Sequence, residues 1–219
     1  MARRLAYHLD DRPVVYALPR GGVPVAAEVA AQVNAPLALL MVRKIGAPSR
    51  PDLAIGAVVD GFRPTLILNE DVLHSIDVSI DELQQAKREA LAEIERRRQI
   101  YLDGRAAVPI AGRTVVVVDD GIATGATAEA GLRAIRQQRP KRLILATPVA
   151  APDAIIRLRP FADEIVCLKQ PTPFKAVGAY YASFPQLTDA DVKQVLAIHD
   201  AHPPERLPAP LVQPASAAG

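Results

Sequence analysis

Four consecutive β-branched residues at positions 115–118 constrain the fold of this chain more than any other feature. A run that is apolar at every position predicts a strand covered on both faces, as in the parallel sheet of an α/β protein. Asp119 and Asp120 follow at the carboxyl end of that strand, where open α/β sheets bind their ligands. A small-residue turn then leads into a helical pattern at 128–138, so an acidic pair and a helix N-terminus occur together.

The turn between the acidic pair and the helix carries Thr124, Gly125 and Thr127. A glycine-containing turn at a helix N-terminus presents backbone N–H groups to an anion, and carboxylates accept from sugar hydroxyls or hold a divalent cation. A sugar phosphate needs both kinds of group: N–H groups for its phosphate, and carboxylates for its hydroxyls or for a bound cation. A Walker loop is excluded because Ala126 stands where its lysine belongs, and a haloacid-dehalogenase motif because Gly121 replaces its second aspartate. The remaining alternative is an ordinary turn capped by the two aspartates.

Strand and helix patterns alternate along the chain, which predicts an open, twisted, mainly parallel sheet with helices on both faces. The expected strands, besides the one at 115–118, cover residues 14–18, 37–42, 54–59, 65–68, 142–147 and 164–168. The expected helices cover residues 23–33, 79–102, a segment after Pro152, and about 188–199, where Thr188 and Asp191 have capping spacing.

The helix expected at 79–102 combines an apolar stripe with a basic run at 96–98. The stripe consists of Ile80, Leu83, Ala90, Leu91, Ile94 and Tyr101. Glutamates interleave the basic run, and Glu93 stands four residues before Arg97, so a solvated surface is the preferred interpretation. With a net charge of only +2, the chain is not expected to bind nucleic acid.

Two further segments carry positive charge at the ends of expected strands. Arg20, Gly21 and Gly22 follow the first strand and open a helix, so their N–H groups and a guanidinium can meet phosphate oxygens. Residues 43–51 begin with Arg43 and Lys44 and contain glycine and proline, as expected of a polar connection that closes over a leaving group. An ordinary strand-to-helix turn and an exposed basic loop are the respective alternatives.

Residues 115–127 resemble the phosphoribosyl-pyrophosphate (PRPP) signature of the type I phosphoribosyltransferases, and over about residues 1–200 the chain is similar to a bacterial group of predicted phosphoribosyltransferases. The resemblance implies Mg²⁺-dependent transfer of phosphoribosyl from PRPP, in nucleotide metabolism, to a small acceptor. In this resemblance Asp119 and Asp120 are catalytic residues that bind the ribose and Mg²⁺, the latter partly through water. The 5′-phosphate is bound by Ala123, Thr124, Gly125, Ala126 and Thr127, and the pyrophosphate by Arg20, Gly21 and Gly22. Arg43 and Lys44 are catalytic residues of a flexible loop.

The acceptor is less constrained than PRPP. Ala123 stands where enzymes for 6-oxopurines carry an aspartate, so the resemblance argues against guanine and hypoxanthine and permits adenine. A small hood at 170–186 offers Phe174, Tyr180 and Tyr181 as rings that could stack on an acceptor. A satellite core built from the same rings is the alternative. A PRPP-binding regulator with little or no transferase activity is the alternative function, although it would not need the cationic segment.

The expected organisation is one phosphoribosyltransferase domain at 1–201, with a helical insertion at 79–102, followed by a Pro/Ala-rich tail at 202–219. No segment has the pattern of a membrane span or a signal peptide. Because the single Cys167 also cannot form an internal disulfide, a cytoplasmic protein is expected. A homodimer is expected, mainly because type I members of the family commonly pair.

Overall fold

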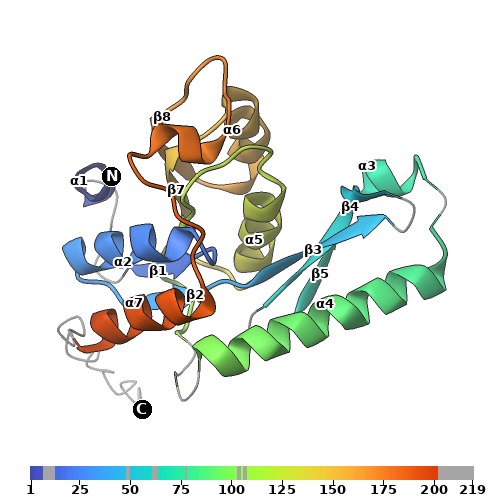
Figure 1. Ribbon diagram of the computed structural model, residues 1–219, viewed down its shortest axis with the longest axis horizontal. Coiled ribbons are helices and arrows are strands. Elements are labelled where there is room, and N and C mark those ends of the chain that lie inside the picture. Colours follow the sequence, from blue (N-terminus) through green and yellow to red (C-terminus); the bar gives the residue numbers. More distant parts are fainter. Residues whose placement is uncertain are drawn as a thin grey trace, which may run out of the picture.

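The computed structural model describes residues 1–6, 13–47, 50–60, 64–76, 78–102, 105 and 108–201. Its centre is a five-stranded sheet in the order β2-β1-β6-β7-β8, with every neighbouring pair parallel (Figure 1). The strands are β1 (Val14–Ala17), β2 (Leu37–Leu39), β6 (Thr114–Val118), β7 (Arg142–Val149) and β8 (Glu164–Lys169). The four-valine run thus forms the middle strand, as expected, and the mainly parallel fold is confirmed.

Helices cover both faces of this sheet. On one face α2 (Gly22–Gln32) and α7 (Asp189–Ala201) pack against Val116 and Val118. On the other face α5 (Ala126–Gln137) and α6 (Pro152–Leu158) pack against Val115 and Val117. All four valines are fully buried, and each contributes roughly 1.5–3 kcal/mol to stability, which fixes the register of the strand that leads to the acidic pair.

A second sheet of three antiparallel strands, in the order β3-β4-β5, projects beside the first (Figure 1). It contains β3 (Val42–Ala47), β4 (Arg50–Val59) and β5 (Thr65–Leu68), and it is called the arm below. The short α3 (Glu70–Leu73) follows β5, and the long α4 (Ile80–Tyr101) runs back along one face of the arm (Figure 1). The second half of α5 covers the other face, so the arm is anchored to the parallel sheet.

The arm corrects two expectations. The strand expected at 37–42 is two strands in different sheets. Leu40 N–H still donates to Ala17 O of β1 at 2.9 Å, and the chain then leaves the parallel sheet and begins β3 at Val42. The prediction that residues 43–51 form a polar connection is wrong, because 43–47 and 50–59 pair as strands. Backbone hydrogen bonds to a neighbouring strand outweigh the local bias of its glycine and prolines. Residues 48 and 49 lie outside the described residues.

Helix α4 confirms most of its expected pattern. Ala90, Ile94 and Tyr101 are buried, but Ile80 is 79% exposed, so it does not belong to the packed stripe. The Glu93–Arg97 pair is present at 2.7 Å. The basic run is not simply a solvated face, because Arg98 donates at 2.7 Å to the buried carboxylate of Asp60 at the end of β4.

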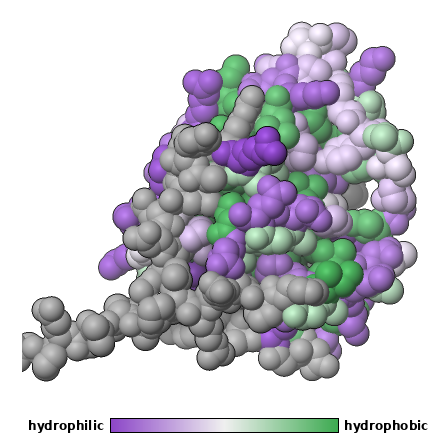
Figure 2. All heavy atoms as spheres, turned by 90° about the vertical axis from the view of Figure 1, so that its left-hand side faces the viewer, coloured by the Kyte–Doolittle hydropathy of each residue, from purple (hydrophilic) through white to green (hydrophobic). Residues whose placement is uncertain are grey.

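The remaining elements are α1 (Ala2–Ala6), which the sequence did not predict, and two short 3₁₀ helices, η1 (Arg159–Phe161) and η2 (Val177–Tyr180). On the side of the molecule that holds α2 and α7, hydrophilic and hydrophobic residues are intermixed (Figure 2). Within the described ranges, no helix has both the length and the apolar character needed to cross a bilayer. The tail expected at 202–219 lies outside the described residues.

Candidate active site

Two loops meet at the carboxyl edge of the parallel sheet, because the strands before them, β1 and β6, are direct neighbours. The first loop contains Arg20, Gly21 and Gly22, and its Pro19–Arg20 peptide bond is cis. The second loop begins with Asp119 and Asp120. The two loops approach each other closely, since a Cβ on Gly21 would displace the Asp120 carboxylate and one on Gly22 would lie 2.7 Å from the backbone oxygen of Val118.

The acidic pair is held close to the sheet. Asp119 N–H donates to Ala146 O at 3.2 Å, and Asp120 N–H donates to a carboxylate oxygen of Asp119 at 3.0 Å. Burial, together with the neighbouring charge of Asp120, raises the pKa of Asp119 well above its usual value. Ligand groups that donate hydrogen bonds, or a cation, would offset this repulsion.

The donor set of the acidic pair fits Mg²⁺ in the way expected for a substrate-bound ion. Among the described residues, no three histidine, cysteine or acidic side chains gather into a metal cage. Mg²⁺ commonly keeps waters and binds through one or two carboxylates plus phosphate oxygens of the substrate. Asp119 and Asp120 could supply those carboxylates.

The loop after the acidic pair is fastened to β7 before it enters α5. Ile122 N–H donates to Val149 O at 3.0 Å, and Ile122 O accepts from Ala151 N–H at 2.8 Å. Gly125 adopts a φ of 82°, a left-handed conformation that favours glycine, and α5 begins at the next residue. The N–H groups of the first turn have no acceptors within the helix, and Ala123, Thr124 and Thr127 are exposed beside them. This geometry can hold a phosphate.

Glu129 is a carboxylate in the first turn of α5 and would repel an anion bound at this loop, but neighbouring arginines neutralise its charge. Glu129 accepts from Arg157 of α6 at 2.8 Å and lies 3.3 Å from the guanidinium of Arg133. Glu129 is therefore a charged neighbour of residues 123–127, the candidate phosphate loop, and two arginines compensate its charge. The sequence gives no local sign of this arrangement, because Arg157 lies 28 residues away in the chain.

Arg43 and Lys44 lie on β3, at the base of the arm, and both are exposed. The start of β3 is near the end of β1, since Leu40 pairs with Ala17 and Met41 O accepts from Asp60 N–H at 2.7 Å. The two cations thus project from a strand rather than from a loop. The described backbone contacts place the start of this strand near the site.

The hood at 170–186 lies against the acidic loop. Tyr181 Oη donates to Asp120 O at 2.6 Å, and Val177 occupies the space where a Cβ on Gly121 would lie. Burial, with the charges of Asp120 and then Asp119, raises the pKa of Tyr181 to about 12, so it remains a hydrogen-bond donor at neutral pH. The hydroxyl of Tyr181 is therefore engaged in holding the hood on the site.

The aromatic rings of the hood pack on one another in two pairs. The centroids of Phe174 and Tyr180 are 5.6 Å apart, and those of Tyr181 and Phe184 are 5.0 Å apart. All of the rings remain partly exposed. Phe184 was not among the predicted acceptor residues, because its packing against Tyr181 is a feature of the fold.

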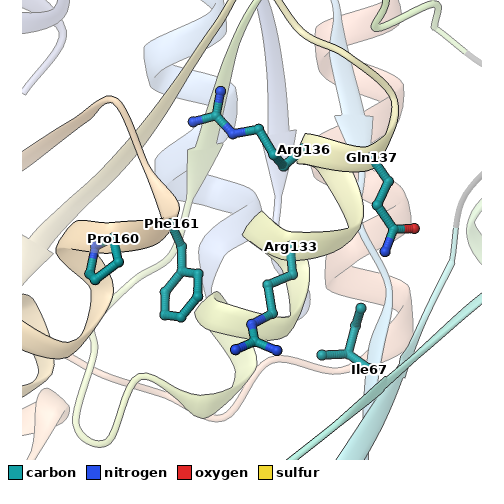
Figure 3. A pocket seen from close by; sticks show the side chains of 6 residues that line it. All are labelled: Ile67, Arg133, Arg136, Gln137, Pro160 and Phe161. Atoms are coloured by element: carbon teal, nitrogen blue, oxygen red, sulfur yellow. The ribbon is translucent and has the colours of Figure 1, made fainter.

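A groove of about 320 Å³ lies elsewhere, at the last turns of α5 (Figure 3). It is lined by Ile67, Arg133, Arg136, Gln137, Pro160 and Phe161. Its two arginines are already engaged: Arg133 lies 4.7 Å from the centroid of the Phe161 ring, and Arg136 pairs with Asp163 at 2.9 Å. The phosphate loop is at the opposite end of the same helix, so this groove is separate from the candidate site.

Several known proteins are similar to most of this chain. Residues 1–183 match the family model described as phosphoribosyl transferase domain. Two curated relatives from Mycobacterium tuberculosis, strains CDC 1551 / Oshkosh and ATCC 25618 / H37Rv, carry provisional phosphoribosyl transferase names and are 44% identical over 193 residues. That is 88% of this chain but 43% of each relative, so the chain spans less than half their length. The crystal structure of TT1426 from Thermus thermophilus is 41% identical, with a TM-score of 0.75, over 89% of this chain and 91% of that one.

Proposed function

Because the chain belongs to the phosphoribosyl transferase domain family, we propose that it transfers the phosphoribosyl group of PRPP to a small acceptor and releases pyrophosphate. The observation that carries this proposal is the contact between Asp120 and Gly21. It brings together an acidic pair, the phosphate loop after β6 and the cationic loop after β1. A molecule with a ribose between a phosphate and a pyrophosphate fits that combination.

The proposed reaction breaks the bond between the anomeric carbon and pyrophosphate and forms a bond from that carbon to an acceptor atom. Positive charge develops on the sugar, where Asp119 and Asp120 accept from its hydroxyls and stabilise the charge. Negative charge develops on the leaving group, where Arg20 and the N–H groups of Gly21 and Gly22 donate. Mg²⁺, when bound with pyrophosphate, supplies further charge neutralisation.

Arg43 and Lys44 are proposed to reach the pyrophosphate from β3. Their strand is joined to the end of β1 through the Leu40–Ala17 hydrogen bond, and both side chains are exposed. A movement of the arm relative to the parallel sheet would bring these charges toward the leaving group. The 5′-phosphate is proposed to lie on residues 123–127, where Thr124 and Thr127 are exposed at the start of α5.

The acceptor is proposed to lie under the hood, near Phe174 and Tyr180. Tyr181 takes a positioning role in this proposal, because its hydroxyl is already bonded to Asp120 O. An aminopurine such as adenine or a non-purine small molecule is favoured over a 6-oxopurine, since Ala123 offers no carboxylate to the ring.

The test is an acceptor screen with purified protein, Mg²⁺ and PRPP, in which pyrophosphate release is followed for a panel of nucleobases and small nitrogenous compounds. Asp120→Asn serves as the inactive control. Release that depends on both an acceptor and Mg²⁺ supports the transferase. Tight PRPP binding without release for any acceptor would instead favour the regulatory alternative, and the lack of PRPP binding would refute both.

We also propose that the protein acts in the cytoplasm as a homodimer. The dimer is proposed because type I members of the family commonly form dimers. A sedimentation mass equal to the 23.5 kDa chain at micromolar concentration would refute it.

A further inference from the structure

Three distant segments of the chain converge on the carboxylate of Asp189, at the start of α7. One oxygen accepts from the hydroxyl of Tyr101 at 2.5 Å and lies 3.6 Å from a guanidinium nitrogen of Arg20. The other oxygen lies 3.7 Å from the guanidinium of Arg96. The cationic loop after β1 is thereby linked to the last two turns of α4 and to the first turn of α7.

The position of Asp189 is fixed independently of Arg20. Asp191 N–H donates to Thr188 Oγ1 at 3.2 Å while Thr188 N–H donates to the Asp191 carboxylate at 2.7 Å, which caps α7 immediately before Asp189. Tyr101 is buried and bonds to the same carboxylate from α4. The hydrogen bond from Tyr101, followed by the nearby arginines, lowers the pKa of Asp189 although slight burial opposes this, so the residue is an anion at neutral pH.

We propose that Asp189 is a positioning residue that holds the guanidinium of Arg20 in place for the pyrophosphate of the substrate. The inference rests on the proposed function, since it takes Arg20 to be a pyrophosphate ligand. One nitrogen of Arg20 lies 3.6 Å from Asp189, and a guanidinium has five N–H donors, so donors remain for phosphate oxygens. Ordering a long side chain before the ligand arrives reduces the entropic cost of binding.

The alternative is that Asp189 competes with the ligand as an internal anion. Its charge is already compensated by Arg20, Arg96 and the Tyr101 hydroxyl, so its removal would relieve little repulsion. Loss of the charge would, however, release Arg20, whose side chain is 36% exposed. The expected net effect is therefore weaker binding. Asp189 also lies beyond residues 1–183 that match the family model, so the match does not assign it this role.

The test is a double-mutant cycle of Asp189→Asn and Arg20→Gln, with Mg²⁺-PRPP binding measured by titration calorimetry. Asparagine keeps an oxygen acceptor for Tyr101 and removes only the charge. The matched control is Asp200→Asn on the same helix, which removes a carboxylate that lies 2.6 Å from Arg105. Asp189→Asn should weaken binding about two- to tenfold in the wild-type background and have no effect when Arg20 is already replaced.

The control should bind PRPP like the wild type, and both Asn variants should unfold within a few degrees of each other. Unchanged or tighter binding by Asp189→Asn, while the wild type binds PRPP, would overturn this inference alone. Equal weakening with and without Arg20 would also overturn it, because a general effect on the fold would then explain the loss. A wild-type protein that does not bind PRPP would overturn the proposed function and this inference with it.

Discussion

The carboxylate of Asp120 lies over the backbone of Gly21, in the space that a side chain at position 21 would fill. Both residues follow neighbouring parallel strands, so the contact is a direct result of the order of the sheet. It places negative charge next to a loop that presents N–H groups and Arg20. A ligand that carries both hydroxyls and phosphates could satisfy the two loops at once.

Replacement of Gly21 by alanine should force the Asp120 carboxylate out of its position. We expect a loss of about 1–3 kcal/mol in the free energy of unfolding, as for other overpacked sites, and at least tenfold weaker Mg²⁺-PRPP binding. Chemical denaturation and calorimetry measure the two effects. In an Asp120→Ala background, where the carboxylate is absent, Gly21→Ala should cost much less stability. An equal cost in both backgrounds would contradict the steric explanation.

Asp120→Asn should weaken PRPP binding about tenfold or more with little change in stability, because the carboxylate is expected to meet ligand groups. Asp163→Asn is the matched control. Asp163 accepts from Arg136 at 2.9 Å and from Leu143 N–H at 2.7 Å, far along the chain from both site loops, so its replacement should cost about 1 kcal/mol of stability and leave binding unchanged. The same PRPP affinity in Asp120→Asn and wild type would remove Asp120 from the site.

Lys44→Ala should lower the rate of transfer more than it weakens ground-state binding of PRPP, because the charge is proposed to approach the leaving group during turnover. A comparison of single-turnover rates with calorimetric affinities measures the difference. Lys141→Ala, an exposed lysine at the opposite end of the parallel sheet, is the control. Equal losses of rate and affinity would indicate a static anchor on β3.

Guanine and hypoxanthine should be poor acceptors. An unpaired polar ring edge costs roughly 1–3 kcal/mol, so these bases should react about ten- to a hundredfold more slowly than the best acceptor in the panel. Initial rates of nucleotide formation at matched acceptor concentrations give the comparison. Guanine turnover as fast as that of the best other acceptor would contradict the role assigned to Ala123.

Stability should fall as the pH drops below about 6.5, the ordinary pKa of histidine, because His199 is buried on α7. Burial, supported by the charge of Arg105, lowers the pKa of His199, although Asp200 and the Ala35 backbone act in the other direction. The unfolded chain then binds more protons than the folded one between the lowered pKa and 6.5, so unfolding becomes easier there. Denaturation midpoints across pH 5–8 should decline less in His199→Gln, whereas replacement of the exposed His74 should not alter the decline.

The parallel sheet could be predicted because its strands are apolar at nearly every position. Val115–Val118 are buried on both faces, and that condition leaves a signal in the sequence that does not depend on distant partners. The acidic pair and the glycine turn follow the same strand, so the first part of the candidate site was visible as well. The other part of the candidate site, the loop with Arg20, Gly21 and Gly22, was predicted from the glycines that follow β1.

The arm was predicted only in part, because its pairing is non-local. Arg43 and Lys44 are consecutive exposed residues, and the register shifts at Gly46, so β3 lacks the simple alternation of a half-buried strand. Pro48 and Pro51 strengthened the impression of a loop. The pairing of Arg20 with Asp189 and of Glu129 with Arg157 could not be predicted either, since only the packing of separate helices brings these residues together.

The pairing of Glu129 with Arg157 means that the potential at the phosphate loop is set partly by a neighbouring helix. If α6 moved away, Glu129 would keep only Arg133 of its own helix, so its negative charge would be less compensated in the first turn of α5, where an anion is expected. Arg157 is 45% exposed, so mobile ions reach this pair and screen it over about 8 Å at physiological ionic strength. If residues 123–127 hold the proposed phosphate, their affinity for it would depend both on the packing of α6 and on the salt around the protein.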